Sequence, residues 1–333
     1  MPEPLLRVRG VRKLFPIKAA GWRTHAQRVV HAVDDVNFDL GAGEALALVG
    51  ESGCGKSTLA LTLLGLEPLT AGSIRFEGQE LAGAPPEVWR LARRHIQMIF
   101  QDPYESLNPL MTVGEIVAEP LQVHKLATAT EERRRRIMAA LDDAGLKPAQ
   151  HFMRRFPHEL SGGQRQRVAI AAALVLEPRL LVADEPVSML DVSIRAEILN
   201  LLADLKVRRQ IAVLFITHDL GTVSAIADRI AVMYLGRIVE IGAVNDVLTT
   251  PQHPYTQALL SVVPAPNPRL RRQHIILQGE TPDPVNLPAG CRFHPRCPVA
   301  IARCHQVDPV LQAVGAGHAV ACIRTTELRT NTL

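Results

Sequence analysis

The stretch Gly50-Glu51-Ser52-Gly53-Cys54-Gly55-Lys56-Ser57 decides the fold. It has the form G-x4-G-K-S, follows the apolar run Ala45–Val49 and precedes Lys56–Leu66, whose composition suits a helix. Glycines let the backbone curl so that its N–H groups face a phosphate, and the helix directs its positive end at the same anion. Lys56 then supplies a cation near the β and γ phosphates, and Ser57 offers a hydroxyl to Mg²⁺. The stretch therefore predicts a P-loop that binds MgATP, formed by Gly50, Glu51, Ser52, Gly53, Cys54, Gly55, Lys56, Ser57 and Thr58.

Two carboxylates end a second predicted strand, Leu180–Ala183. Asp184 is placed to hold Mg²⁺ directly or through water, and Glu185 can polarise the water that attacks the γ-phosphate. His218 follows the predicted strand Ile211–Thr217, where a neutral imidazole could orient that water. A lone histidine in such a place is more often structural, but its position after the next core strand favours the catalytic interpretation.

The motif Leu160-Ser161-Gly162-Gly163-Gln164 predicts a second phosphate site. Ser161 can cap a helix that begins near Gly162, and the N-terminus of that helix attracts anions. One chain thus carries two phosphate-binding surfaces far apart in sequence. We expect two cassettes to meet head to tail, each completing the ATP site of the other.

In this order, the motifs resemble the ATP-binding cassette (ABC) superfamily over nearly the whole chain. The resemblance implies that Gln101 is the Q-loop glutamine, which contacts Mg²⁺ and the attacking water and links to a transmembrane partner. It also implies that Ser188 and Asp191 belong to the D-loop at the dimer interface, where Met189 departs from the usual alanine. Phe15 looks like the aromatic that stacks on adenine, the alternative being a core phenylalanine. The implied Mg²⁺ ligands are Ser57, Gln101 and Asp184.

Alternating strands and helices predict an α/β fold with a largely parallel, doubly wound sheet. The resemblance refines this to a P-loop NTPase cassette, with a RecA-like core, an antiparallel β subdomain and an inserted helical subdomain. We divide the chain into a first core part at 1–102, a helical subdomain at 103–159, a second core part at 160–245 and a C-terminal extension at 246–333. The extension is proline-rich and predicts a linker or irregular appendage. No internal repeat is visible, so we expect one cassette.

Further stretches resemble the ATPases of dipeptide and oligopeptide importers, in particular the F-type member of each ATPase pair. They include Phe15-Pro16-Ile17-Lys18 and His253-Pro254-Tyr255-Thr256-Gln257-Ala258-Leu259-Leu260. The resemblance implies a second ATPase subunit, either a paralogous D-type chain or a copy of itself. It also implies two permease subunits, an extracytoplasmic binding protein and a peripheral place on the cytoplasmic face of the cell membrane. Related systems move nickel, glutathione or peptide-like compounds, so the substrate stays open.

Four of the five cysteines lie close to the C-terminus: Cys291, Cys297, Cys304 and Cys322. An odd total without an export signal argues against a disulfide framework. Some members of the importer group hold a [4Fe–4S] cluster in this region, and four thiolates can ligate one. Zinc and plain reduced thiols remain alternatives, although the C-x2-C pairs typical of zinc sites are missing.

Composition and motif spacing argue against several other classes of protein. The net charge is only +4, so nothing demands nucleic acid, and the run Arg133–Arg136 fits a solvated helix face. No apolar run approaches the ~18 residues that a membrane span needs, and the N-terminus lacks a signal-peptide layout. The short gap between P-loop and signature argues against genome-maintenance ATPases, and the single cassette argues against translation-associated ones. Glu185 and His218 favour hydrolysis over a nucleotide sensor, and the importer-like tail argues against an exporter.

Overall fold

A computed structural model describes residues 3–17, 28–263 and 274–325. The chain divides into two compact units. The first, here called the helical unit, comprises Met1–Leu5, Leu40–Ala45 and Gly83–Ile216. The second, here called the P-loop unit, comprises Leu6–Asp39, Leu46–Ala82 and Thr217–Leu333.

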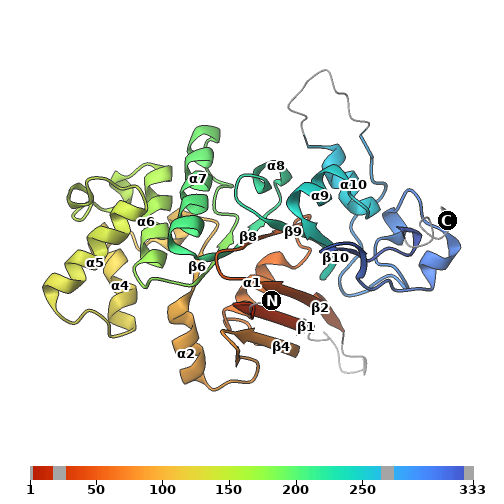
Figure 1. Ribbon diagram of the computed structural model, residues 1–333, viewed down its shortest axis with the longest axis horizontal. Coiled ribbons are helices and arrows are strands. Elements are labelled where there is room, and N and C mark those ends of the chain that lie inside the picture. The colour runs from red at the N-terminus through yellow and green to blue at the C-terminus, as the bar shows by residue number, and fades with distance from the viewer. Residues whose placement is uncertain (1–2, 18–27, 264–273, 326–333) are drawn as a thin grey trace. The chain divides into compact units, whose positions relative to one another are not determined.

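One part of the P-loop unit is an antiparallel sheet (Figure 1), whose strand order is β2–β1–β4–β5. Its strands are β1 (Leu6–Pro16), β2 (Val29–Leu40), β4 (Ala71–Phe76) and β5 (Gln79–Glu80). Buried side chains alternate along β1, where Leu6 and Val8 have no exposed surface. This alternation is what a strand with one covered face requires.

The remaining strands of this unit follow the order β11–β12–β10–β9–β3. The parallel pair is β3 (Ala45–Val49) with β9 (Arg229–Tyr234), and β10 (Arg237–Ala243) returns antiparallel beside β9. Leu235 and Gly236 both have positive φ, 42° and 80°, as a tight hairpin turn requires.

The C-terminal extension is more ordered than its composition predicts. Strands β11 (Gln312–Gly315) and β12 (His318–Val320) continue the sheet, because β12 pairs with β10 and β11 pairs with β12. These strands span only a few residues each, so they carry no readable alternation. The prediction of an irregular appendage is therefore wrong for this stretch.

The buried carboxylate of Glu240 on β10 fixes the extension to the sheet. Glu240 is fully buried, and its oxygens accept the backbone N–H groups of Gln252 at 2.7 Å and His253 at 3.0 Å. Nε2 of His318 lies 2.8 Å from the same carboxylate. One side chain thus joins β10 to the two residues that precede helix α10 (Pro254–Ser261) and to β12.

Short helices complete the P-loop unit. They are α1 (Lys56–Leu63), α8 (Leu220–Val223), α9 (Val244–Thr249), α10 (Pro254–Ser261), η3 (His294–Arg296) and η4 (Ala302–His305). Helix α8 is a single turn that ends at Val223. Ala225 and Ile226 donate to carbonyls three residues back, which tightens the chain into turns.

The helical unit contains three parallel strands and most of the long helices. Its strands are β6 (Ile96–Ile99), β7 (Leu180–Asp184) and β8 (Ala212–Thr217), in the order β8–β7–β6. Its helices are α2 (Pro86–His95), α3 (Pro103–Ser106), α4 (Val113–Val123), α5 (Thr130–Asp143), η1 (Ala149–His151), η2 (Pro157–Glu159), α6 (Gly162–Leu174) and α7 (Val192–Arg209). Helices α4, α5 and α6 pack against one another (Figure 1).

Within residues 3–17, 28–263 and 274–325, no helix combines the length and the apolar character that crossing a bilayer would take.

Candidate functional site

The P-loop joins β3 to α1, as its sequence predicts, and two of its glycines are sterically required. A Cβ on Gly50 would lie 2.2 Å from the carbonyl oxygen of Met233. A Cβ on Gly55 would lie 2.0 Å from the carbonyl oxygen of Ala32, and Gly55 has a φ of 106°. A side chain at either position would force the backbone apart. The loop therefore keeps its curled shape only with glycine in these places.

Lys56 lies inside this loop. Its side chain is buried, and Nζ donates to the carbonyl oxygens of Gly50 at 2.8 Å and Glu51 at 3.0 Å. Ser57 follows on the first turn of α1 and is exposed. A buried cation, an exposed serine and a helix N-terminus thus lie within one loop and the first turn of its helix, which are the groups a polyphosphate with Mg²⁺ needs. The nearby Cys54 is a buried thiol whose pKa is raised by burial, which Lys56 only partly offsets.

Two predicted catalytic residues of the helical unit lie together. Asp184 ends β7, and Glu185 follows with a φ of 46°, a conformation that a glutamate rarely adopts. The Glu185 N–H donates to the carbonyl oxygen of Ile216 at 2.9 Å, which holds this turn. Nε2 of Gln101 donates to Oε2 of Glu185 at 3.2 Å. Strained backbone gathers at functional sites, so the geometry marks Glu185 as a candidate catalytic residue.

The signature motif forms a complete helix cap. The Ser161 hydroxyl accepts the backbone N–H of Gln164 at 3.3 Å, and the Gln164 side chain accepts the Ser161 N–H at 3.1 Å. This reciprocal pair confirms that Ser161 caps α6. A Cβ on Gly163 would lie 2.5 Å from a methyl carbon of Ile194, so α6 and α7 approach closely only with glycine there.

The predicted D-loop residues follow β7 in the same unit. Ser188 Oγ donates to the carbonyl oxygen of Glu185 at 3.0 Å, and Asp191 is the residue before α7. In the P-loop unit, His218 is exposed directly after β8. Phe15 on β1 is half-buried, and Nζ of Lys13 lies 4.5 Å from its ring centroid. Phe15 is thus neither a core residue nor a free ring.

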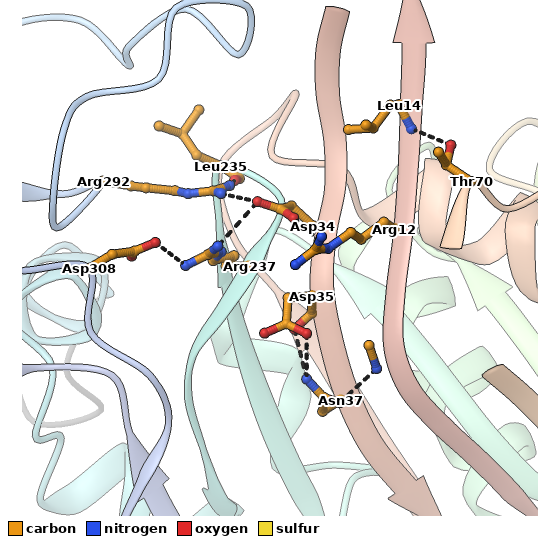
Figure 2. Close-up of polar contacts among 11 residues, drawn as sticks. Arg12, Leu14, Asp34, Asp35, Asn37, Thr70, Leu235, Arg237, Arg292 and Asp308 are labelled. Carbon is orange, nitrogen blue, oxygen red and sulfur yellow. Dashed lines mark hydrogen bonds and ion pairs between the residues drawn. The ribbon is translucent and has the colours of Figure 1, made fainter. Parts of the chain in front are cut away.

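Contacts between the C-terminal extension and the P-loop unit's first strands were not anticipated from the sequence. Figure 2 shows Asp34 on β2 meeting three guanidinium groups. Arg12 lies 3.1 Å from its carboxylate, Arg237 lies 3.2 Å away, and Arg292 of the extension makes a short ion pair with it. Arg237 also pairs with Asp308 at 2.5 Å. Burial alone would raise the pKa of Asp34, but Arg292 and the other two arginines hold it below its usual value.

A second unanticipated contact reaches the P-loop itself. Arg296 of the extension pairs with the carboxylate of Glu51, which Thr281 also contacts, while Tyr255 accepts the Glu51 N–H. Little in the sequence predicts this contact between the extension and the P-loop. Tyr255 lies in a stretch that resembles peptide importers, but neither Arg296 nor Thr281 belongs to a recognisable motif.

The four C-terminal cysteines line one small cavity of ≈ 20 Å³ together with His294. All are free thiols. The Cys291 N–H donates to the carbonyl oxygen of Cys304 at 2.9 Å. Burial, together with the proximity of the other three sulfurs, raises the pKa of Cys291 to about 11, and burial also raises that of Cys297. As bare thiols, Cys291 and Cys297 therefore resist ionisation.

Comparison with known proteins agrees with this fold and geometry. Residues 33–188 match the family described as "ABC transporter". A solved structure titled as a dimeric post-hydrolysis state of the ATP-binding cassette MJ0796, bound to ADP and Pi, has a TM-score of 0.62 and 29% identity. It covers 72% of this chain and 98% of that one. The structure of cbiO1 from Clostridium perfringens, described as part of the ABC transporter complex cbiONQ, has a TM-score of 0.63 and 29% identity, covering 74% of this chain and 91% of that one. Fold and site together define an ATP-hydrolysing P-loop cassette.

Relatives in sequence narrow the class. Residues 239–304 match the family described as "Oligopeptide/dipeptide transporter, C-terminal region". The chain is 46% identical over 327 residues to the oligopeptide transport ATP-binding protein OppF of Escherichia coli, covering 97% of both chains. It is 48% identical over 322 residues to the probable peptide ABC transporter ATP-binding protein y4tS of Sinorhizobium fredii, covering 97% of this chain and 90% of the relative. The chain belongs to the ABC transporter family, in the group of ATP-binding subunits that carry the oligopeptide/dipeptide C-terminal region.

Proposed function

We propose that this chain is the ATPase subunit of an importer for di- or oligopeptides. The observation that carries the proposal is the match of residues 239–304 to the peptide-transporter C-terminal region, on a chain that aligns with peptide-transport subunits over nearly its whole length. Nickel, glutathione or another peptide-like solute is the alternative substrate class. The partners are a second ATPase subunit, paralogous or identical, and two permease subunits, which hold this chain at the cytoplasmic face of the membrane.

The proposed division of labour follows the site residues. Gly50–Thr58, Lys56 among them, would bind the phosphates, and Ser57, Gln101 and Asp184 would hold Mg²⁺. Glu185 promotes attack of water on the γ-phosphate, and His218 orients that water. The helix capped by Ser161 serves the ATP of the partner cassette, beside the D-loop residues Ser188 and Asp191. Phe15 stacks on the adenine.

Glu185→Gln tests the catalytic part of the proposal. The amide keeps the shape and the hydrogen-bonding capacity of the side chain but cannot act as a base, so we expect hydrolysis to fall at least about a hundredfold. MgATP should still bind and should now hold two cassettes together long enough to appear as a dimer in size-exclusion chromatography. Full turnover by this variant would refute the role of Glu185. Lys56→Ala is the matched control, because it should lose ATP binding and dimer formation together.

Substrate and partners need a separate test. The chain should be purified from its native membrane, its partner chains identified, and ATP hydrolysis of the reconstituted complex measured with its binding protein and candidate solutes. We expect stimulation by short peptides. Stimulation by nickel or glutathione alone would move the assignment to the alternative substrate class.

For the cysteine site we propose a [4Fe–4S] cluster in preference to zinc. A tetrahedral zinc ion brings its sulfur ligands to within about 4 Å of one another. Among the residues that the structure describes, no three His, Cys, Asp or Glu side chains are grouped to hold one metal ion. A cluster takes one thiolate per iron and so accepts ligands that surround a wider space. The four cysteines are among the residues that line a common cavity, which would have to widen from ≈ 20 Å³ to hold a cluster. Such a cluster would cross-link the parts of the extension that carry the four cysteines.

Iron and sulfide analysis after anaerobic purification tests the cluster. About four irons per chain, lost on substitution of Cys304 by serine, are expected. Stoichiometric zinc, or no metal in anaerobically handled protein, would refute it.

A further inference from the structure

The P-loop is held from outside by three residues of the extension, and all three act on Glu51. The Glu51 N–H donates to the Tyr255 hydroxyl at 3.0 Å. Thr281 Oγ1 donates to Oε2 of the Glu51 carboxylate at 3.0 Å. Arg296 binds both carboxylate oxygens, through Nη1 to Oε2 at 2.8 Å and Nη2 to Oε1 at 3.1 Å. Backbone and side chain of the loop's second residue are thus fixed by a region that lies more than 200 residues away in sequence.

The contact between Arg296 and Glu51 is well shielded. The Arg296 side chain is 9% exposed, that of Glu51 is 28% exposed, and the guanidinium carbon lies 6.0 Å from the ring centroid of Tyr234. A two-point fork fixes the direction of a carboxylate as well as its charge. Burial alone would raise the pKa of Glu51, but the hydrogen bonds from Arg296 and Thr281 and the charges of Arg296 and Lys56 bring it below its usual value. Glu51 is therefore ionised at neutral pH and neutralised by Arg296.

A free carboxylate at this position would harm ATP binding in two ways. It belongs to the loop whose N–H groups face the phosphates, so its charge would repel a triphosphate. It would also compete for Lys56, whose Nζ already lies 3.0 Å from the Glu51 carbonyl oxygen. A partner that binds both oxygens removes both effects.

We propose that Arg296 is a positioning residue for the ATP site, which neutralises and orients Glu51 so that the P-loop accepts a triphosphate. This inference rests on the proposed role of the P-loop. It makes the extension part of the nucleotide site. Because Arg296 directly precedes Cys297, the cysteine segment and the loop share one contact.

Equilibrium binding of a fluorescent ATP analogue with Mg²⁺ to the full chain tests the proposal, using Arg296→Met, Glu51→Gln and the double variant. We expect Arg296→Met to weaken binding about tenfold, the equivalent of one charge-assisted hydrogen bond. Glu51→Gln should bind at least as well as the parent, since Arg296 is then free to attract phosphate. The double variant should recover to within about threefold of the parent, because the repelling charge is gone. Arg292→Met is the matched control. It removes a guanidinium from the same segment, but that guanidinium pairs with Asp34 and not with Glu51, so the affinity for the ATP analogue should stay within about twofold of the parent.

Each outcome decides a specific point. A double variant as weak as Arg296→Met would mean that Arg296 only packs, which overturns the proposal. Unchanged affinity in Arg296→Met, with binding lost in Lys56→Ala, would also overturn it while leaving the P-loop assignment intact. Retained binding in Lys56→Ala would instead refute the P-loop assignment on which it rests. Should Arg296→Met fail to fold, Arg296→Lys keeps the charge without the fork and should bind about threefold more weakly; equal affinity there refutes the proposal.

Discussion

Removing the carboxylate of Asp34 should destabilise the chain by about 3 kcal/mol. Three arginines surround this carboxylate, but they differ in exposure: the side chain of Arg12 is 49% exposed, that of Arg237 is 22% exposed and that of Arg292 is 8% exposed. In Asp34→Ala, water can solvate Arg12, and Arg237 keeps Asp308 as a partner. Arg292 would stay desolvated with only a neutral acceptor, the carbonyl oxygen of Leu235 at 2.6 Å.

The cost is therefore that of one buried charge left without its counterion, which is typically about 3–5 kcal/mol. The hydrogen bond to the Leu235 carbonyl places the expected value near the lower end of that range. Replacing both partners should cost much less stability. Asp34→Ala alone leaves the buried Arg292 charge without a counterion, and adding Arg292→Met removes that charge. We expect the double variant to lose about 1 kcal/mol.

Urea unfolding followed by circular dichroism provides the assay, with Asp308→Asn as the control for an exposed pair, expected to cost at most about 1 kcal/mol. A loss below about 1 kcal/mol in Asp34→Ala would contradict the reasoning. So would a double variant less stable than Asp34→Ala, because the buried charge would then not be the cause.

Two further predictions concern the P-loop and acid stability. Gly55→Ala should lose at least about 2 kcal/mol of stability and most ATP binding, because its Cβ would lie 2.0 Å from the Ala32 carbonyl oxygen. Gly53→Ala is the control: its φ of 79° imposes backbone strain of the same kind, but nothing lies within 4 Å of the new Cβ, so only Gly55→Ala adds a clash. Equal thermal denaturation midpoints in the two variants would contradict this. His253 is buried, and burial lowers its pKa to about 3. The unfolded chain binds a proton there below its ordinary pKa of 6.5 while the folded chain stays neutral, so stability should fall as pH drops from 6.5 towards 3, by about 2 kcal/mol between pH 7 and pH 5. His253→Asn, which retains an acceptor for the Tyr255 N–H, should flatten that dependence in denaturation measured against pH, and an unchanged slope would rule His253 out as the source.

The sequence predicts those parts of the fold whose signals are local. The strand Ala45–Val49 is a continuous apolar run that stops at a glycine, and its observed bounds coincide with the prediction. The Ser161 cap rests on neighbouring residues, so it too could be read directly. The roles of the individual ATP-site residues remain predictions.

What the sequence misses depends on partners that are distant along the chain. The two short strands of the extension gain their structure from β10, and a few residues of each give no periodic signal. The pairing of Arg296 with Glu51 joins a charged residue in a proline-rich stretch to a variable position of a phosphate-loop motif. An arginine in the one stretch does not predict a glutamate in the other, and the glutamate does not predict the arginine. Likewise, a cluster of four cysteines suggests a metal, but only their arrangement around a common cavity bears on which kind.

The buried carboxylate of Glu240 sets a limit on how cassettes of this kind can be recombined. A chimera that joins this extension to another cassette must place the junction upstream of Glu240. An extension transferred from the proline-rich stretch onward would lack the carboxylate that binds it to the sheet. Conversely, a chain shortened before His318 would retain an ionisable group in the protein interior with one of its three partners gone. The modular boundary for engineering therefore lies inside the last core hairpin.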